Sequence, residues 1–496
     1  MSGIRVTYSG LISFVVGLVS VFTGLGFTLI ITRELSPEEF GTWSLIGGLT
    51  GYVLILEPII SYWTTREIAR GRESGRTALL SSNLFSGISS IAYIIIILGF
   101  VTLIDVDQEV LLFAVILIPV LFVRHTLTAI NQGHKPQTGQ FGYLAFELTK
   151  IPVALLLIYF LQMGIYGVIL TAFIASLVSI VVQLSRTSHK LRGKFKKETL
   201  KRWLKIFWLP IYPRISGLML ISDIIIVTLI VGTVEDIAYW AAAFAVASIV
   251  LIAGRIAIPL YPKLLQGGRR EYFQENLIQV FYFAFPFCSM TIIFARPALF
   301  VLNPLYESAL SVVIILTFVM FVRMLGGLFQ SPLAGIEEVD KNKNSTFKDY
   351  LKSKLFYLPT LTIIQQVSYL GSLVIMLLLF ADIEPRINLI IYWAIVALIT
   401  QIPFTAYLYL LIKKDFSPKI NHKAISKYLG TCFVIFGLTY FFMDNYLVYT
   451  ESIFEFLPQF MPFAVLSFGS YLVITFIVDR KTKKLFKSVV KEIFKK

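Results

Sequence analysis

Ionisable residues lie inside long apolar runs of this 496-residue chain. An Arg, Lys or Asp at the centre of a membrane helix costs about 2.5–3.5 kcal/mol on insertion scales, so it needs a partner, a water-filled cavity or a route to the interface. The basic residues outnumber the acidic ones, and a cavity of that sign suits a phosphate or diphosphate group, which arginine binds through two hydrogen bonds. The basic residues are Arg124, Lys150, Arg214, Arg255, Arg296 and Arg323, and the acidic ones are Glu57, Glu147 and Asp223.

Several of these residues also have a structural interpretation. Lys150 follows Glu147 by three residues, so the two share a helix face and could satisfy each other. Arg214 lies in the sequence IYPRIS, whose prolines predict an interrupted helix, and broken helices at membrane depth line cavities. Arg296 lies near a predicted helix end, and we expect its side chain to extend to the interface.

The remaining charges leave two interpretations open. Arg124, Arg255 and Arg323 lie six or seven residues from predicted helix ends, where they could reach the interface or face a cavity. We expect these three, with Lys150 and Arg214, to form a cationic substrate-binding wall. The acidic residues Glu57, Glu147 and Asp223 are candidates for coupling to a driving ion, or are counter-ions to the cations.

Composition assigns the chain to the integral membrane proteins. It is 57% hydrophobic and 15% charged, with a mean hydropathy of +0.79, whereas soluble domains carry about 25% charged residues. The net charge of +15 is explained by basic cytoplasmic loops, so no nucleic-acid partner is expected. Two cysteines inside apolar runs and four scattered histidines predict no disulfide, no metal site and no cofactor.

Apolar runs predict an all-α polytopic protein of about 14 transmembrane helices. The run from Leu11 to Ile31 is long enough to span a bilayer at a helical rise of about 1.5 Å per residue. The predicted spans are 10–32, 40–61, 79–103, 109–130, 141–161, 164–184, 206–232, 237–262, 277–301, 308–330, 357–381, 387–412, 428–449 and 457–479.

Loop charges give this count an independent check. Outside the apolar runs, lysines and arginines fall in one alternating set of segments, and only Arg33 and Arg386 fall in the opposite set. The positive-inside rule then places both termini in the cytoplasm, with residues 186–205 as a basic cytoplasmic linker. The tail at 480–496 predicts a basic amphipathic helix on the anionic inner membrane surface, with a solvated helix as the alternative.

The chain contains an internal repeat. EEFGTW at 38–43 matches EDIAYW at 235–240, and LFVR at 121–124 matches MFVR at 320–323, with offsets of 197 and 199 residues. Six helices per repeat give parallel, pseudo-symmetric lobes with a central cavity and alternating access. The predicted lobes are 1–185 (helices 1–6) and 206–412 (helices 7–12), followed by an appended helix pair at 428–479. Arg124 and Arg323 are equivalent in this repeat, and we expect them to hold a headgroup from both lobes.

In helix count, loop charge and internal repeat, the chain resembles a known family. The resemblance covers nearly the whole chain and is to the polysaccharide-export and O-antigen-type flippases of the multidrug/oligosaccharidyl-lipid/polysaccharide (MOP) superfamily. It rests on TRELSPEEFGTW at 32–43, TREIAR at 65–70, Pro210, Asp223, Gly232, the run from Tyr239 to Ala243, and Pro259 to Pro262.

The resemblance implies transport across the plasma membrane rather than an enzymatic reaction. Its members move a polyprenyl-(di)phosphate-linked or dolichyl-phosphate-linked sugar from the inner to the outer leaflet. The implied partners are this lipid-linked oligosaccharide, membrane lipids and H⁺ or Na⁺ as a coupling ion, and a monomer is expected. Helix 1 carries no acid, unlike many drug/cation antiporters of the superfamily, and no internal arginine, unlike the peptidoglycan-precursor flippases.

Two other functions remain open from sequence. An integral-membrane glycosyltransferase or ligase could use the pair Asp105 and Asp107, because carboxylates at this spacing can bind a divalent cation beside a phosphate. The same pair is explained more simply as acids in a short turn. A drug/cation antiporter on the same fold would need an acidic, aromatic cavity, and the excess of buried cations argues against it.

Overall fold

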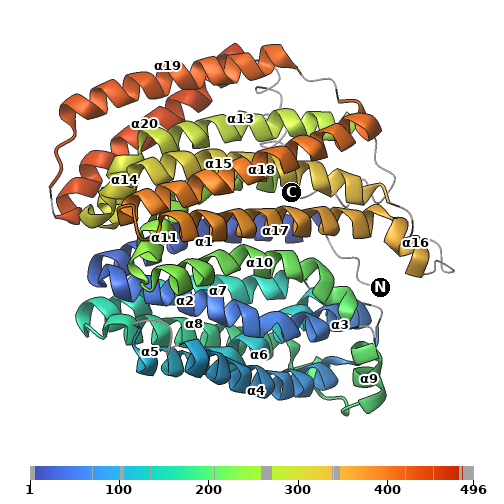
Figure 1. Cartoon of the computed structure of the whole chain (residues 1–496). Coiled ribbons are helices and arrows are strands. Elements are labelled where there is room, and N and C mark those ends of the chain that lie inside the picture. Colours follow the sequence, from blue (N-terminus) through green and yellow to red (C-terminus); the bar gives the residue numbers. More distant parts are fainter. Residues whose placement is uncertain are drawn as a thin grey trace. The chain divides into compact units, whose positions relative to one another are not determined.

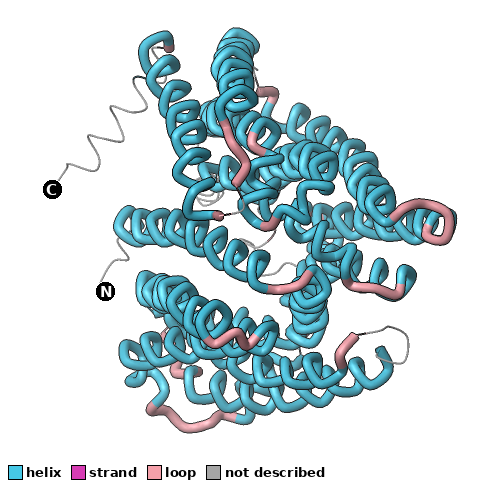
Figure 2. The backbone as a smooth tube through the Cα atoms, turned by 90° about the vertical axis from the view of Figure 1, so that its left-hand side faces the viewer, coloured by secondary structure: helices cyan, strands magenta, loops and turns pink. Residues whose placement is uncertain are grey.

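The computed structural model shows a helical protein in which short loops join long helices (Figures 1 and 2). No strand occurs among the residues that the structure describes. Those residues are 6–69, 71–100, 106–134, 136–205, 207–257, 271–337, 339, 347–418, 421–450, 452–479 and 483.

Short 3₁₀ or π segments interrupt several of the long helices. The first half contains α1 (Val6–Glu34), α2 (Pro37–Val53), η1 (Leu54–Leu56), α3 (Glu57–Ala69), α4 (Gly75–Phe100), α5 (Gln108–Phe113), η2 (Ala114–Ile116), α6 (Leu117–His134), α7 (Pro136–Ala154), η3 (Leu155–Phe160), α8 (Gly164–Thr187), η4 (Ser188–Leu191), α9 (Lys197–Lys205) and α10 (Trp208–Val231). The second half contains α11 (Glu235–Ala247), η5 (Ser248–Ala257), α13 (Glu271–Ile293), α14 (Ala295–Leu302), η6 (Pro304–Ala309), α15 (Leu310–Gly335), α16 (Phe347–Lys352), α17 (Lys354–Phe380), α18 (Arg386–Phe416), α19 (His422–Tyr446) and α20 (Ile453–Val478).

The predicted fold class is confirmed. By length and composition, 13 helical stretches among the described residues could cross a membrane, and α1, with 29 residues, corresponds to the first predicted span. Each of the other predicted spans overlaps one of these stretches. The predicted tail at 480–496 lies outside the described residues, apart from Lys483.

Two compact units make up the chain, residues 1–241 with 370–386 and residues 242–369 with 387–496. We call them unit 1 and unit 2. They are defined by packing, whereas the predicted lobes are defined by the repeat, so the lobes stay a prediction. The matching segments EEFGTW and EDIAYW lie at the starts of α2 and α11, and a 3₁₀ segment follows each of these helices.

Unit 1 is built by helices that pack in pairs. Helix α1 packs against α7, α3 and α4 both pack against α6, α7 packs against α8, and α10 packs against α2. Helix α4 buries its serines, including Ser82 and Ser89, and exposes Leu84, Ile91 and Ile95. This reverses the pattern of a soluble helix, and it is the arrangement expected where lipid is the surrounding solvent.

The α1–α2 turn is fixed by the residues that begin α2. Ser36 and Glu39 form a capping box, and Pro37 occupies the first turn, where its missing N–H removes no helical hydrogen bond. Glu39 also accepts a hydrogen bond from the N–H of Ile165 at the start of α8. The matching turn lies close by, because a Cβ on Gly41 would collide with the carbonyl of Val234, just before α11.

Residues 186–205, predicted as a basic linker, contain a helix that docks on unit 1. Helix α9 packs against α3 and α4 (Figure 1). Trp203 is fully buried in a cluster with Ile60 and Ala78, while Arg202 forms an ion pair with Glu67 at the end of α3. The linker is therefore a packed part of the unit.

Unit 2 has two cores. One joins η5, α13 and α15 to parts of α17 and α18 through residues such as Phe273, Met324 and Leu408. The other holds the α19–α20 pair against α13, where Tyr282 shares a hydrogen bond with Thr475 at 2.8 Å.

Candidate functional site

Unit 1 contains a cavity of about 460 Å³ between α3, α6 and α10, lined by both polar and apolar groups, which we call the α3–α6–α10 cavity. Its charged and titratable lining residues are Glu57, His125 and Arg214, with the phenol of Tyr62. Hydroxyl and amide groups complete the polar wall, from Ser61, Thr65, Thr128 and Gln132. Such a lining can bind an anion and can donate to or accept from sugar hydroxyls.

Glu57 is placed in the cavity by a change in helix type. The chain passes from α2 through the 3₁₀ turn η1 and restarts as α3 at Glu57, with Pro58 next. Glu57 is 5% exposed, and its carboxylate accepts a hydrogen bond from Ser61, one turn later. Its Oε2 lies 4.0 Å from Nδ1 of His125 on α6.

A close approach of α3 and α6 forms one side of the cavity. Thr65 donates a hydrogen bond to the carbonyl of Ala129 at 3.1 Å. A Cβ on Gly133 would lie 2.7 Å from the carbonyl oxygen of Thr65, so the absence of a side chain there permits the contact. The cavity therefore has a tightly packed wall behind its polar groups.

Arg214 reaches the cavity from a continuous helix. The prolines of IYPRIS predict an interrupted helix, and this prediction is wrong, because α10 runs unbroken from Trp208 to Val231. Pro210 falls in the first turn, where a missing N–H breaks no helical hydrogen bond. Arg214 lines the cavity from this helix.

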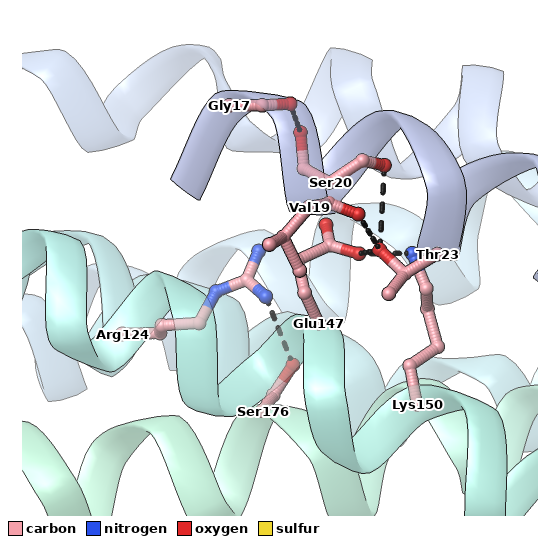
Figure 3. A network of polar contacts seen from close by, with 8 residues as sticks. All are labelled: Gly17, Val19, Ser20, Thr23, Arg124, Glu147, Lys150 and Ser176. Atoms are coloured by element: carbon pink, nitrogen blue, oxygen red, sulfur yellow. Dashed lines mark hydrogen bonds and ion pairs between the residues drawn. The ribbon is translucent and has the colours of Figure 1, made fainter. Parts of the chain in front are cut away.

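A second charged network lies between α1, α6, α7 and α8 (Figure 3). The ion pair that the spacing predicts is present, with Lys150 Nζ 2.7 Å from Oε2 of Glu147. The same Oε2 accepts a hydrogen bond from Thr23 of α1 at 2.5 Å. Both members of the pair are buried.

Arg124 belongs to this network and not to the cavity lining. Its Nη1 donates to Oγ of Ser176 at 3.3 Å, and its guanidinium carbon lies 4.5 Å from the ring centre of Phe146. Because the next residue, His125, lines the cavity, two neighbours on α6 serve two separate polar sites. Lys150 Nζ also lies 5.5 Å from the ring centre of Phe146.

The other predicted site residues are more widely spread. Asp223 is buried on α10, where its Oδ1 accepts a hydrogen bond from the N–H of Ile224. Arg323 lies on α15 of unit 2, and Arg255 lies in η5, with a side chain outside the described part of the structure. Arg296 pairs with Glu307 at 2.8 Å and stacks over a tyrosine ring, so it has a partner that the sequence analysis missed.

Of the two acidic residues that could bind a metal, Asp105 and Asp107, the second has a structural role. Asp107 caps α5 by accepting a hydrogen bond from the N–H of Glu109 at 2.8 Å, and Asp105 lies outside the described residues. Within the described ranges, no group of three or more His, Cys, Asp or Glu side chains is arranged to hold a metal ion.

Besides the neutral polar lining residues and Tyr62, His125 is a cavity residue that the sequence does not single out. In the sequence it is one of four scattered histidines. One signal was present, since it follows Arg124 inside an apolar run and neighbouring charges in such a run call for a polar surrounding. Its contact with Glu57, 68 residues earlier in the chain, needs the packing of α3 on α6.

Comparison with known proteins identifies a similar sequence. No protein-family model matches the sequence. A relative named "Putative O-antigen transporter", from Shigella flexneri, is 26% identical over 319 residues, covering 59% of this chain and 74% of that protein.

Solved structures show the same fold. The lipid II flippase MurJ, in an inward closed conformation, matches with a TM-score of 0.61 at 14% identity, over 96% of this chain and 99% of that one. An inward-facing multidrug resistance transporter of the MATE family matches with a TM-score of 0.55 at 15% identity, over 80% of this chain and 95% of that one. The chain is thus a multi-pass membrane protein with the fold of these transporters, and the predicted resemblance to O-antigen transporters is confirmed by the sequence relative.

Proposed function

We propose that this chain moves a polyprenyl-(di)phosphate-linked oligosaccharide from the inner to the outer leaflet of the plasma membrane by alternating access. In this proposal both termini are cytoplasmic, the protein acts as a monomer and it catalyses no covalent reaction. The observation that carries the proposal is the α3–α6–α10 cavity, where Arg214 provides a fixed positive charge beside neutral polar groups. Two comparisons support the proposal: the sequence relative is named an O-antigen transporter, and the fold is similar to that of the lipid II flippase MurJ.

The cavity fits the headgroup of such a lipid and not its tail. A volume of about 460 Å³ is in the range of small-molecule sites, so it could take a phosphate with the first part of the sugar. Arginine binds phosphate oxygens through two hydrogen bonds, and the Ser61, Thr65 and Gln132 side chains offer partners for sugar hydroxyls. The polyprenyl chain would stay in the bilayer.

The other predicted residues enter the proposal as supporting charges. Arg124 and Lys150, from the adjacent network, would raise the positive potential of unit 1 around the headgroup. Arg323 is the proposed counterpart of Arg124 in the second repeat, and Arg255 is a further predicted cation of the cavity wall. Glu57, Glu147 and Asp223 are the candidates for H⁺ or Na⁺ coupling or serve as counter-ions, and Glu57 is the one that lines the cavity.

A drug/cation antiporter is the second candidate, because the same cavity contains a buried carboxylate and an aromatic ring. Glu57 and Tyr62 could attract an organic cation, as acidic aromatic sites do. The two functions predict opposite responses to a change of charge at position 214. Removing the arginine should weaken an anion carrier and should not weaken a cation carrier.

Transfer of a labelled lipid-linked sugar between leaflets of proteoliposomes tests the proposal. We expect transfer by the wild-type chain, loss of at least tenfold in Arg214→Glu, and partial retention in Arg214→Lys. Arg296→Gln is the matched control, since that arginine pairs with Glu307 in unit 2. Transfer no faster than in protein-free vesicles, together with proton-driven uptake of an organic cation, would favour the antiporter.

A further inference from the structure

Two titratable groups that carry opposite charges when ionised meet in the α3–α6–α10 cavity. Glu57 Oε2 and His125 Nδ1 are 4.0 Å apart, close enough for each to feel the charge of the other. The Glu57 carboxylate is held by Ser61 and is nearly buried, whereas the imidazole is substantially exposed within the cavity. A ligand that enters can therefore reach the histidine side of the pair.

Few other charges face this pair among the described residues. Arg214 lines the cavity from α10, and Tyr62 lines it from α3. Arg124 is the neighbour of His125 on α6, but its guanidinium points to Phe146 and Ser176. With Glu57 ionised and His125 neutral, the lining holds one positive and one negative charge, so an added anion is not balanced.

We infer that an anionic phosphate headgroup binds in this cavity together with a proton, which is taken up by His125 or by Glu57. The inference rests on the proposed function and adds its regulation. A negative charge beside Arg214 stabilises imidazolium and disfavours a second carboxylate nearby, so it favours protonation of both groups. The sign of the effect is therefore the same whichever group takes the proton.

Proton binding and headgroup binding affect each other equally, and this has a consequence for transport. If the headgroup increases proton affinity, then lower pH must increase headgroup affinity by the same factor. The proton and the headgroup would occupy the cavity together and would not compete for it. Each phosphate would then cross with one negative charge fewer, which weakens the dependence of transfer on the membrane potential.

Proton uptake on binding can be measured directly by calorimetry. The full-length protein in zwitterionic nanodiscs would be titrated with farnesyl phosphoryl glucose in two buffers of different ionisation heat at several pH values. This probe is a phosphodiester, so it lacks the second phosphate proton of a monoester, which titrates at about pH 6. The difference in heat between buffers gives the protons bound per ligand.

We expect the wild type to take up a measurable fraction of a proton near pH 7, and to bind at least threefold tighter at pH 6 than at pH 8. His125→Gln and Glu57→Gln should each reduce uptake, and the double variant should remove it while retaining Arg214-dependent binding. His422→Gln, at the exposed start of α19, is the matched control and should behave as wild type. Size-exclusion profiles and melting curves would show that each variant is folded.

Three outcomes would overturn the inference. The first is binding of the probe without proton uptake, and the second is proton uptake that is unchanged in the double variant. Either result would contradict the inference and would leave the proposed flippase activity standing. Failure of the probe to bind at any pH would remove the cavity as a headgroup site, and with it the inference. The leaflet-transfer assay would still decide the flippase proposal on its own.

Discussion

Lys150 and Glu147 form a buried ion pair, with Nζ and Oε2 2.7 Å apart and the residues 8% and 4% exposed. Thr23 supplies a further hydrogen bond to the carboxylate from α1. Two desolvated charges in this geometry contribute little net stability, because their attraction offsets the loss of hydration. Removing one partner is different, since it leaves the other charge buried and unpaired.

Substituting one partner of this pair should therefore destabilise the protein more than substituting both. Lys150→Met or Glu147→Leu alone should cost about 3–5 kcal/mol, whereas the two substitutions together should cost markedly less. The measurement is the thermal midpoint of the detergent-solubilised protein, followed by loss of the monodisperse chromatographic peak. If the double variant is as unstable as the sum of the single variants, the pair is not a self-contained unit.

This pair also shows what the sequence could reveal about the site. Residues three apart on one helix meet whatever the tertiary fold, so Glu147 and Lys150 could be paired from spacing alone. The helix spans were predictable for the same local reason, because apolar length is a property of one segment. The contact of Glu57 with His125 could not be predicted, since it depends on how α3 packs against α6.

Two further features show where local reasoning fails. The prolines near Arg214 predict a broken helix, but Pro210 lies in the first turn of α10, where a proline is tolerated, and only the true start of the helix reveals that position. The segment at 186–205 seemed a loop because it is basic. The buried Trp203 that docks α9 is one aromatic residue among charges, and its partners Ile60 and Ala78 lie far away in the sequence.

Gly41 allows the α1–α2 turn to approach the chain before α11. Gly41→Ala should be destabilising by about 1–3 kcal/mol, because the new Cβ would collide with the carbonyl of Val234. Gly47→Ala is the control on the same helix, since a Cβ there meets nothing within 4 Å, and it should be neutral or slightly stabilising. Equal melting curves for the two variants would contradict the close approach.

Trp203 should anchor α9 to unit 1. The side chain is fully buried, so Trp203→Ala should cost about 3–5 kcal/mol through the lost packing and the cavity it leaves. Leu204, the next residue, is 40% exposed, and Leu204→Ala should change stability by about 0.5 kcal/mol or less. Limited proteolysis between residues 190 and 206 would report undocking, with faster cleavage expected only in the tryptophan variant.

The predicted repeat pairs Arg124 with Arg323, and the headgroup proposal gives both a functional role. Reversing the charge, as Arg124→Glu or Arg323→Glu, should abolish complementation of a transport-deficient strain at unchanged membrane expression. The physical reason is that an acidic side chain at either position repels a phosphate and lowers the positive potential that attracts it. Arg124→Lys keeps the charge but loses the planar stacking on Phe146, so it should retain part of the activity.

The control for these reversals must be an arginine with no proposed part in binding. Arg296→Gln meets this condition, because Arg296 is exposed and its partner Glu307 is close to it in sequence. Full activity in both reversals would show that the charges at these positions do not support headgroup binding. Loss of activity in Arg124→Glu alone would instead locate recognition in unit 1, which contains both the α3–α6–α10 cavity and the Arg124 network.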